Sequence, residues 1–333
     1  MLSVVCPIYN EEKYIAACID SVLLQDYPRE DMEVIFADGM STDATREIVA
    51  SYTARYPFIR LIDNPERRVS QGMNHAIRAS RGDVVIRLDA HAEYPSNYFS
   101  RLTEALADLS AENVGGVCIT LPCAETDTCR AIAAVLSSSF GMGNSAFRVG
   151  TDRIKEVDTV PFGCWHRSLF DRIGFFDTDL IRNQDDEFNG RIIRHGGRIF
   201  LLPDVQIKYY ARDKIKKVSR MFYQYGMYKP LVNKKLGAPA TVRQFVPVAL
   251  VTGLILGAVL SLVWHPFAWI YGAGVLLYLL TALTVSAASG GSLRKVLLQA
   301  WTYVVVHVSY GWGYLDGLVR LILNRPFSST ANR

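Results

Sequence analysis

Apolar and polar positions follow two different periods along the first two hundred residues. Three short apolar runs, Leu2–Ile8, Glu33–Ala37 and Val84–Leu88, each end in polar residues. Between these runs, apolar side chains recur at helical spacing over residues 11–25, 42–56 and 71–80. Strands that alternate with helices predict βαβ units, so the pattern indicates an α/β fold on a mostly parallel sheet.

The pattern changes in the last third of the chain, where apolar residues run nearly unbroken. Residues 245–264 and 267–288 each approach the roughly 20 apolar residues that cross a bilayer, and His265-Pro266 between them predicts a tight hairpin. The next segment, Val296–Leu323, contains His307, Asp316 and several glycines. We favour a third span for it, with a re-entrant or interfacial helix as the alternative.

A basic segment lies just before the apolar region. Residues 208–220 hold six basic side chains against one acid, Asp213, with apolar residues at helical spacing. This predicts an amphipathic helix on an anionic membrane surface, the alternative being a solvated helix. The chain therefore divides into an α/β domain (1–207), a basic interface region (208–244), a transmembrane region (245–323) and a tail (324–333).

Charge and cysteine content narrow the choice of partners and compartment. A net charge of +4 is too small to indicate nucleic acid, so no nucleic-acid partner is expected. The six cysteines include no CxxC pair, which is typical of a reduced intracellular domain. The first apolar run is too short for a signal peptide and lacks a basic lead. Basic residues flank both ends of the hairpin, so we expect a multi-pass protein of the inner (plasma) membrane with the α/β domain in the cytoplasm.

Polar residues follow each predicted strand. Asn10, Asp38 and Asp89 all fall at the carboxyl ends of strands, where parallel sheets bind ligands. Asp89 and His91 leave one strand two residues apart and can turn toward one cation. Carboxylate and imidazole together suit Mn²⁺ or Mg²⁺, and such an ion neutralises a diphosphate leaving group.

An acidic cluster, Asn183-Gln-Asp-Asp-Glu187, precedes a predicted helix. Acids at this position stabilise the helix N-terminus through the macrodipole, which is the structural explanation. Three consecutive acids exceed what capping needs, so one of them is a candidate general base.

These segments together resemble glycosyltransferase family 2, and within it the bacterial exopolysaccharide glucosyltransferases of succinoglycan type. The motifs that carry the resemblance are Pro7-Ile-Tyr-Asn-Glu-Glu12, Asp38-Gly-Met-Ser-Thr-Asp43, Gly72-Met-Asn74, Arg87-Leu-Asp-Ala-His91 and Asp185-Asp-Glu-Phe-Asn-Gly-Arg191, with His307-Val-Ser-Tyr-Gly-Trp-Gly313 supporting the subgroup. The resemblance implies a GT-A fold, an inverting mechanism and UDP-glucose as the expected donor.

The resemblance also implies roles for individual residues. Asp185 is the expected general base, with Asp186 as its alternative because Gln184 replaces the usual Glu. Asp89 and His91 are the expected metal ligands for Mn²⁺ or Mg²⁺, although His91 replaces the usual second Asp. The residues expected to bind the nucleotide-sugar are Pro7, Tyr9, Glu11, Asp38 (to uracil or ribose), Asn74 and Asp89. The signature Gln-x-x-Arg-Trp of processive synthases is missing, which favours one sugar per encounter.

Four residues are candidates for binding the acceptor. Trp165 can stack on an acceptor sugar, and a packed core tryptophan is the equal alternative. Arg148, Arg212 and Lys214 can hold the phosphate of a lipid-linked (polyprenyl diphosphate) saccharide acceptor among membrane lipids.

Other functions fit less well. A nucleotidyltransferase should carry a Gly-rich basic loop after the first strand, where this chain has an acidic one, and a dinucleotide oxidoreductase lacks G-x-G-x-x-G. A polyprenyl-phosphate glycosyltransferase is the alternative among glycosyltransferases. A non-catalytic membrane scaffold is the alternative from another class, but a scaffold has no need for acids at successive strand ends.

Overall fold

The computed structural model describes residues 1–239 and 241–327, which divide into two compact units. The first unit comprises Met1–Ile119 and Gly150–Tyr209, and the second comprises Thr120–Val149 and Tyr210–Arg333. The end of the first unit lies close to the expected boundary at 207. However, residues 120–149 group with the C-terminal helices, which the continuous domain 1–207 did not anticipate.

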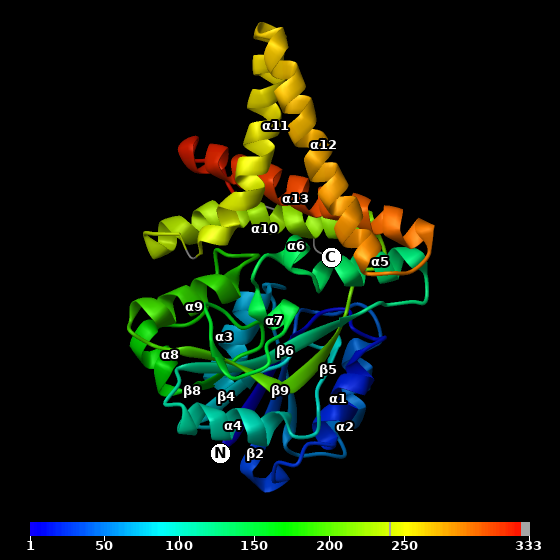
Figure 1. The fold of residues 1–333 in the computed structure, drawn as a ribbon. Helices are drawn as coiled ribbons and strands as arrows, with labels where there is room; N and C mark the ends of the chain where they lie inside the picture. Colours follow the sequence, from blue (N-terminus) through cyan, green and yellow to red (C-terminus); the bar gives the residue numbers. More distant parts are fainter. Residues whose placement is uncertain (240, 328–333) are drawn as a thin grey trace. The chain divides into compact units, whose positions relative to one another are not determined.

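The first unit is built on one mixed sheet (Figure 1). Within the described residues the strand order is β3-β2-β1-β4-β8-β6-β9-β5, and β7 pairs with β9. The strands are β1 (Leu2–Ile8), β2 (Met32–Asp38), β3 (Ile59–Asp63), β4 (Val84–Arg87), β5 (Ala92–Glu93), β6 (Asn113–Leu121), β7 (Lys155–Glu156), β8 (Cys164–His166) and β9 (Ile199–Tyr210).

The three predicted strands are confirmed as β1, β2 and β4. They and β3 pair in parallel, and every residue of β2 is buried, as a strand covered on both faces requires. The sheet is parallel, as expected, only across β1, β2, β3 and β4. β4 pairs antiparallel with β8, β8 with β6, and β9 with both β5 and β7.

Helices of the first unit connect these strands. They are α1 (Ile15–Leu23), η1 (Arg29–Asp31), α2 (Thr45–Thr53), α3 (Val69–Ala79), α4 (Tyr98–Asp108), α8 (Ser168–Ile173) and α9 (Gln184–Arg194). The apolar spacing that predicted α1 is its buried face: Ile15, Cys18, Ile19 and Val22 are all buried.

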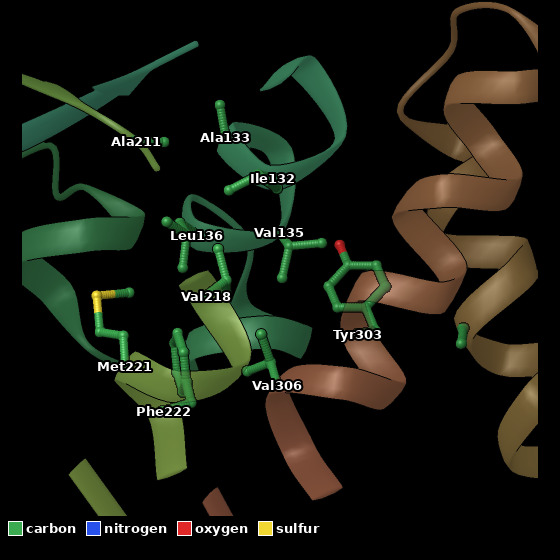
Figure 2. Close-up of a cluster of buried hydrophobic side chains, with 11 residues drawn as sticks. Ile132, Ala133, Val135, Leu136, Ala211, Val218, Met221, Phe222, Tyr303 and Val306 are labelled. Carbon is green, nitrogen blue, oxygen red and sulfur yellow. The ribbon is translucent and has the colours of Figure 1, made fainter. Parts of the chain in front are cut away.

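The second unit is helical. Its elements are α5 (Asp127–Leu136), α6 (Ser139–Met142), α7 (Ala146–Val149), α10 (Ile215–Leu236), η2 (Val242–Gln244), α11 (Phe245–Val263), α12 (His265–Ala288) and α13 (Leu293–Ile322). Ile132 and Leu136 of α5, Phe222 of α10 and Val306 of α13 belong to one buried apolar cluster (Figure 2). The segment 120–149 therefore supplies part of the core of this unit.

The predicted basic amphipathic helix needs correction at its start and on its apolar face. Lys208 lies in β9, and α10 begins only at Ile215. Val218 and Phe222 are buried in the cluster of Figure 2, so the apolar face of α10 packs inside the protein and is not free to lie on lipid. The exposed side of the segment stays basic, with Lys214, Lys216 and Arg220.

Glycines let α10 and α13 approach closely. A Cβ added at Gly226 would meet the backbone of Tyr310, and one at Gly313 would meet the backbone of Tyr223. Beside this contact Tyr223 Oη donates to Asp316 over 2.7 Å. The glycines and Asp316 that weakened the prediction of a third span are thus the residues that hold α13 against α10.

Two helices of the described chain are long and apolar enough to cross a membrane, over Val242–Val263 and His265–Ala288. They form the hairpin that was predicted at His265-Pro266, since α11 ends at Val263 and α12 begins at His265. In Figure 1, α11 and α12 project together away from α10 and α13. The third apolar segment is α13, which does not meet this criterion, and its expected span stays a prediction.

Candidate active site

The polar ends of three parallel strands lie at one edge of the sheet, as predicted. Ile8 of β1 pairs with Asp38 of β2, and Val5 pairs with Arg87, the last residue of β4. The loops after β1 and β2 therefore begin at the same level, whereas β4 ends at the level of Val5, so the residues that follow it run on toward the same edge beside the end of β1. The carboxyl edge of a parallel sheet is where ligands bind.

Asp89, His91 and Glu11 converge at this edge. Asp89 Oδ1 is 2.8 Å from His91 Nδ1, and Glu11 Oε1 is 3.6 Å from the same nitrogen. The Glu11 side chain is buried. Burial lowers the pKa of His91, but the charge and hydrogen bond of Asp89 and the contact with Glu11 outweigh it and raise that pKa well above its usual value. The three side chains therefore form one ion-paired cluster.

The donor atoms of this cluster suit a divalent cation whose remaining ligands come from the substrate and water. Across residues 1–239 and 241–327 no group of three or more His, Cys, Asp or Glu side chains is arranged to hold a metal ion by itself. Asp89 and His91 supply one oxygen and one nitrogen on one side. Mg²⁺ and Mn²⁺ bind in this way, through one or two protein ligands with phosphate and water oxygens in the remaining positions.

Asp185 lies at a neighbouring position and pairs with a buried arginine. It is in the first turn of α9, whose N-cap residue Asn183 adopts a left-handed conformation (φ 60°) and makes no side-chain capping bond. Arg87 Nη1 donates to Asp185 Oδ1. Arg87 is only 5% exposed, and its guanidinium lies 5.8 Å from the Phe162 ring. Asp185 therefore faces the strand ends.

The surroundings of Asp185 set its protonation. Burial raises its pKa, the Arg87 guanidinium opposes this, and the charges of Asp186 and Asp89 add to the rise, so that the pKa is about 6. A carboxyl group with a pKa just below neutrality is ionised at pH 7 yet basic enough to take a proton. This arrangement suits a general base.

Glu187, the last acid of the cluster, has a structural role. Glu187 is buried and receives two hydrogen bonds from Arg191, at 2.7 and 2.8 Å. Arg191 also donates to the carbonyls of Ile173 and Phe175. The Glu187–Arg191 ion pair at the end of the motif therefore fixes the loop before α9 in place.

Asp38 is engaged inside the fold, and the contact with uracil or ribose expected for it stays a prediction. Its carboxylate is 0% exposed. It accepts from Ser41 N at 3.0 Å, from Ser41 Oγ at 2.5 Å and from Arg46 Nη1 at 2.6 Å. Asp38 thus shapes the loop after β2, and a base could reach it only if Arg46 moved.

Asn74 and Trp165 are also used inside the fold. Asn74 Nδ2 donates to Phe176 O at 2.8 Å, and Asn74 Oδ1 accepts from Phe176 N at 3.0 Å, so its amide fixes a loop. The contact with the nucleotide-sugar expected for Asn74 stays a prediction. Trp165 is buried against the rings of Phe170, Phe176 and Phe188. It is the core tryptophan of the two alternatives, and no ring face remains for an acceptor sugar.

The remaining expected ligand residues stay predictions. Pro7 and Tyr9 are half-buried at the end of β1. Arg148, Arg212 and Lys214 belong to the second unit, where Arg148 Nη1 lies 3.5 Å from Thr120 Oγ1.

The sequence interpretation missed two arginines, Arg87 and Arg46. Arg87 could have been noticed, because a charge inside the apolar run Val84–Leu88 must find a partner when it is buried. The signal for Arg46 is weaker, since a polar residue on a surface helix is ordinary. Arg46 joins Asp38 to Asp63 Oδ1 at 2.8 Å.

Among solved structures, the chain is similar to two nucleotide-sugar complexes. One is a mannosyltransferase from Pyrobaculum calidifontis in complex with GDP-mannose and Mn²⁺, with a TM-score of 0.56, 20% identity, and coverage of 97% of this chain and 87% of that one. The other is S. aureus TarS 1-349 in complex with UDP-GlcNAc, with a TM-score of 0.53, 18% identity, and coverage of 95% and 90%. At these identities the likeness concerns the fold.

Sequence comparison is more specific. The chain is 29% identical over 242 residues to the Methanococcus voltae dolichyl N-acetyl-alpha-D-glucosaminyl phosphate 3-beta-D-2,3-diacetamido-2,3-dideoxy-beta-D-glucuronosyltransferase, covering 70% of this chain and 74% of that protein. It is 30% identical over 272 residues to succinoglycan biosynthesis protein ExoA of Rhizobium meliloti, covering 78% of each. A family model described as glycosyl transferase family 2 matches residues 3–175. The chain therefore belongs to glycosyl transferase family 2 and has the GT-A fold that its motifs implied.

Proposed function

We propose that the chain transfers a hexosyl group, glucose being the expected one, from a UDP-sugar to a lipid-linked saccharide, with inversion at the anomeric carbon. The observation that carries this proposal is the convergence of Asp89, His91 and the Arg87–Asp185 pair at the carboxyl edge of β1, β2 and β4. A scaffold protein has no use for an ionisable acid held beside such a cluster.

The donor side follows from the chemistry of the cluster. Asp89 and His91 would hold Mn²⁺ or Mg²⁺, which when bound neutralises the diphosphate leaving group. Glu11 lies 3.6 Å from His91 and orients its ring. The ion pair between the buried Asp38 and the half-exposed Arg46 keeps the loop after β2 in place at the nucleoside end.

The transfer itself needs one proton acceptor. A hydroxyl oxygen of the acceptor forms a bond to the anomeric carbon while the bond from that carbon to the diphosphate oxygen breaks, and UDP leaves with the electron pair. The hydroxyl proton passes to the carboxylate of Asp185. Arg87 holds that carboxylate in position and favours its ionised form.

The acceptor class is inferred from the relatives and from the apolar helices. One relative is named for a dolichyl-phosphate-linked sugar and another for succinoglycan biosynthesis. We place α11 and α12 in the membrane, where they would bring the catalytic domain to lipid-linked substrates. Arg148, Arg212 and Lys214 are the candidates for holding the acceptor phosphate.

A panel of labelled nucleotide sugars tests the proposal. Membranes that contain the chain should pass label from UDP-glucose into material that organic solvent extracts, and membranes with Asp185→Asn should not. Label from another donor would correct the sugar. Label on polyprenyl phosphate without added saccharide would favour the polyprenyl-phosphate glycosyltransferase, and no label from any donor would contradict the proposed activity.

The pH profile should report Asp185. Because the base acts in its ionised form and its pKa is about 6, we expect kcat/KM to be flat above pH 7 and to fall about tenfold for each pH unit below 6. Initial rates between pH 4.5 and about 8 at low donor concentration measure this. A profile that falls only below about pH 4 would exclude a base with a raised pKa.

Arg87 offers the control for that profile. Arg87→Met removes the positive charge that lowers the pKa of Asp185, so the acid limb of the kcat/KM profile should move to higher pH. Arg87→Lys keeps a positive charge and should move the acid limb less. A purely structural role of Arg87 would lower the rate at all pH values without moving the limb.

The position of the hairpin is tested with reporters. A fusion at His265, between α11 and α12, should lie outside the cytoplasm, while fusions at Met1 and Ser292 should lie inside, because Lys234, Lys235, Arg294 and Lys295 flank the two spans. A cytoplasmic reporter at His265 would show that these helices do not cross.

A further inference from the structure

The outer face of α13 is an apolar stripe that runs the whole length of the helix. Leu293, Leu297, Trp301, Trp312, Val319 and Ile322 are between 46% and 76% exposed. At 100° per residue these six positions fall within an arc of about 100°, and 30 residues extend over about 45 Å. Within α13, all of which the structure describes, Arg294 is the one charged residue among the exposed positions.

The opposite face of α13 fixes this orientation. Tyr303 and Val306 are buried in the apolar cluster that α5 and α10 share with α13 (Figure 2). Gly313 and Gly317 lie against the backbone of α10, where any side chain would collide. The helix therefore cannot turn to bury its stripe, and something outside the chain must cover it.

Three observations identify lipid as the cover. The stripe adjoins the hairpin, because α13 packs against both α11 and α12, whose own surfaces are apolar and only 11% buried in their most apolar windows. Arg294 forms part of an open groove with Leu293, Leu297, Leu298 and Trp301, which places a cation beside an apolar surface as a phospholipid requires. At the other end, Arg325 is exposed three residues beyond α13, while Arg320 is paired with Asp316 over 2.7 Å. Tryptophan, finally, is enriched where hydrocarbon meets headgroups.

We propose that α13 lies in the plane of the membrane, with its stripe among the acyl chains of one leaflet and both of its ends at the headgroups of that leaflet. This rests on the proposed crossing of the membrane by α11 and α12. Four residues, 289–292, join α12 to α13, so the leaflet is the one at the Ala288 end of the hairpin. The catalytic unit would then be held by a two-helix anchor and an embedded helix together.

The first test compares the two ends of α13. Cys123 is the exposed native thiol and the other five are buried, so Cys123→Ser supplies the background for single cysteines at 294, 325 and 265. In sealed vesicles a membrane-impermeant maleimide should label Arg294→Cys and Arg325→Cys from the same side, and His265→Cys from the other. Labelling of 294 and 325 from opposite sides would overturn the in-plane helix. Labelling of residue 265 from the same side as residue 294 would instead show that α11 and α12 do not cross the membrane.

The second test asks what covers the stripe. Nitroxide labels at Leu297→Cys and Val319→Cys in lipid vesicles should collide with oxygen more than with a soluble nickel complex, while a label at Lys216→Cys, exposed on α10, should show the reverse. Greater nickel accessibility on the stripe would show that it lies in water and would overturn the proposal. Low accessibility to both, relieved when protein is diluted in lipid, would assign the stripe to a second copy and overturn it as well.

Discussion

Replacing Asp185 with asparagine is expected to leave donor binding nearly intact and to lower turnover by roughly 10²-fold or more. The asparagine keeps the shape of the side chain and can still accept the hydrogen bond from Arg87, but it cannot take the acceptor's proton. UDP affinity, melting temperature and turnover measured on the same preparations separate these effects.

Asp186→Asn is the matched control for this variant. Asp186 is the neighbouring acid in the first turn of α9, and Arg87 forms its ion pair with Asp185. We expect Asp186→Asn to cost clearly less turnover. If both acids served only the helix terminus, both variants would lose about 1 kcal/mol of stability and keep turnover. A dead Asp186→Asn beside an active Asp185→Asn would show that the alternative base is the true one.

The second large effect is expected from Asp89→Ala. Removing this carboxylate takes away one of two protein ligands of the proposed cation and should lower transfer by about 10²-fold or more, since metal stabilisation of the leaving charge contributes several kcal/mol. UDP affinity in Mn²⁺ or Mg²⁺ should fall as well, because the cation bridges protein and diphosphate. Titration of UDP with and without the metal measures that loss directly.

Asp83→Ala makes the corresponding change outside the site. Asp83 precedes β4 and is exposed, with an ion pair to the N-terminus at 3.4 Å. We therefore expect the activity and metal-dependent UDP binding of Asp83→Ala to stay near those of the natural chain. EDTA should inactivate the natural chain and Asp83→Ala alike. Full activity of Asp89→Ala in EDTA would contradict metal use at this position.

The sequence by itself was enough for what depends on neighbouring residues. The periods of apolar positions predicted β1, β2 and β4 and the hairpin of α11 and α12, because alternate or helical burial is a property of each segment alone. Asp89 and His91 are two residues apart at a strand end, so their approach to 2.8 Å follows from local geometry. The ordered motifs then indicated the family.

Tertiary structure alone decided what depends on distant partners. Arg87 and Asp185 are 98 positions apart, and only the packing of α9 against the strand ends brings them together. Residue type likewise could not tell a core Trp165 from one at a surface, or show that Phe176 already uses the amide of Asn74. The stripe of α13 became outward-facing only when glycines fixed its other face on α10. The sequence specifies the chemistry of each side chain, but the groups that a side chain can contact depend on what the fold has buried around it.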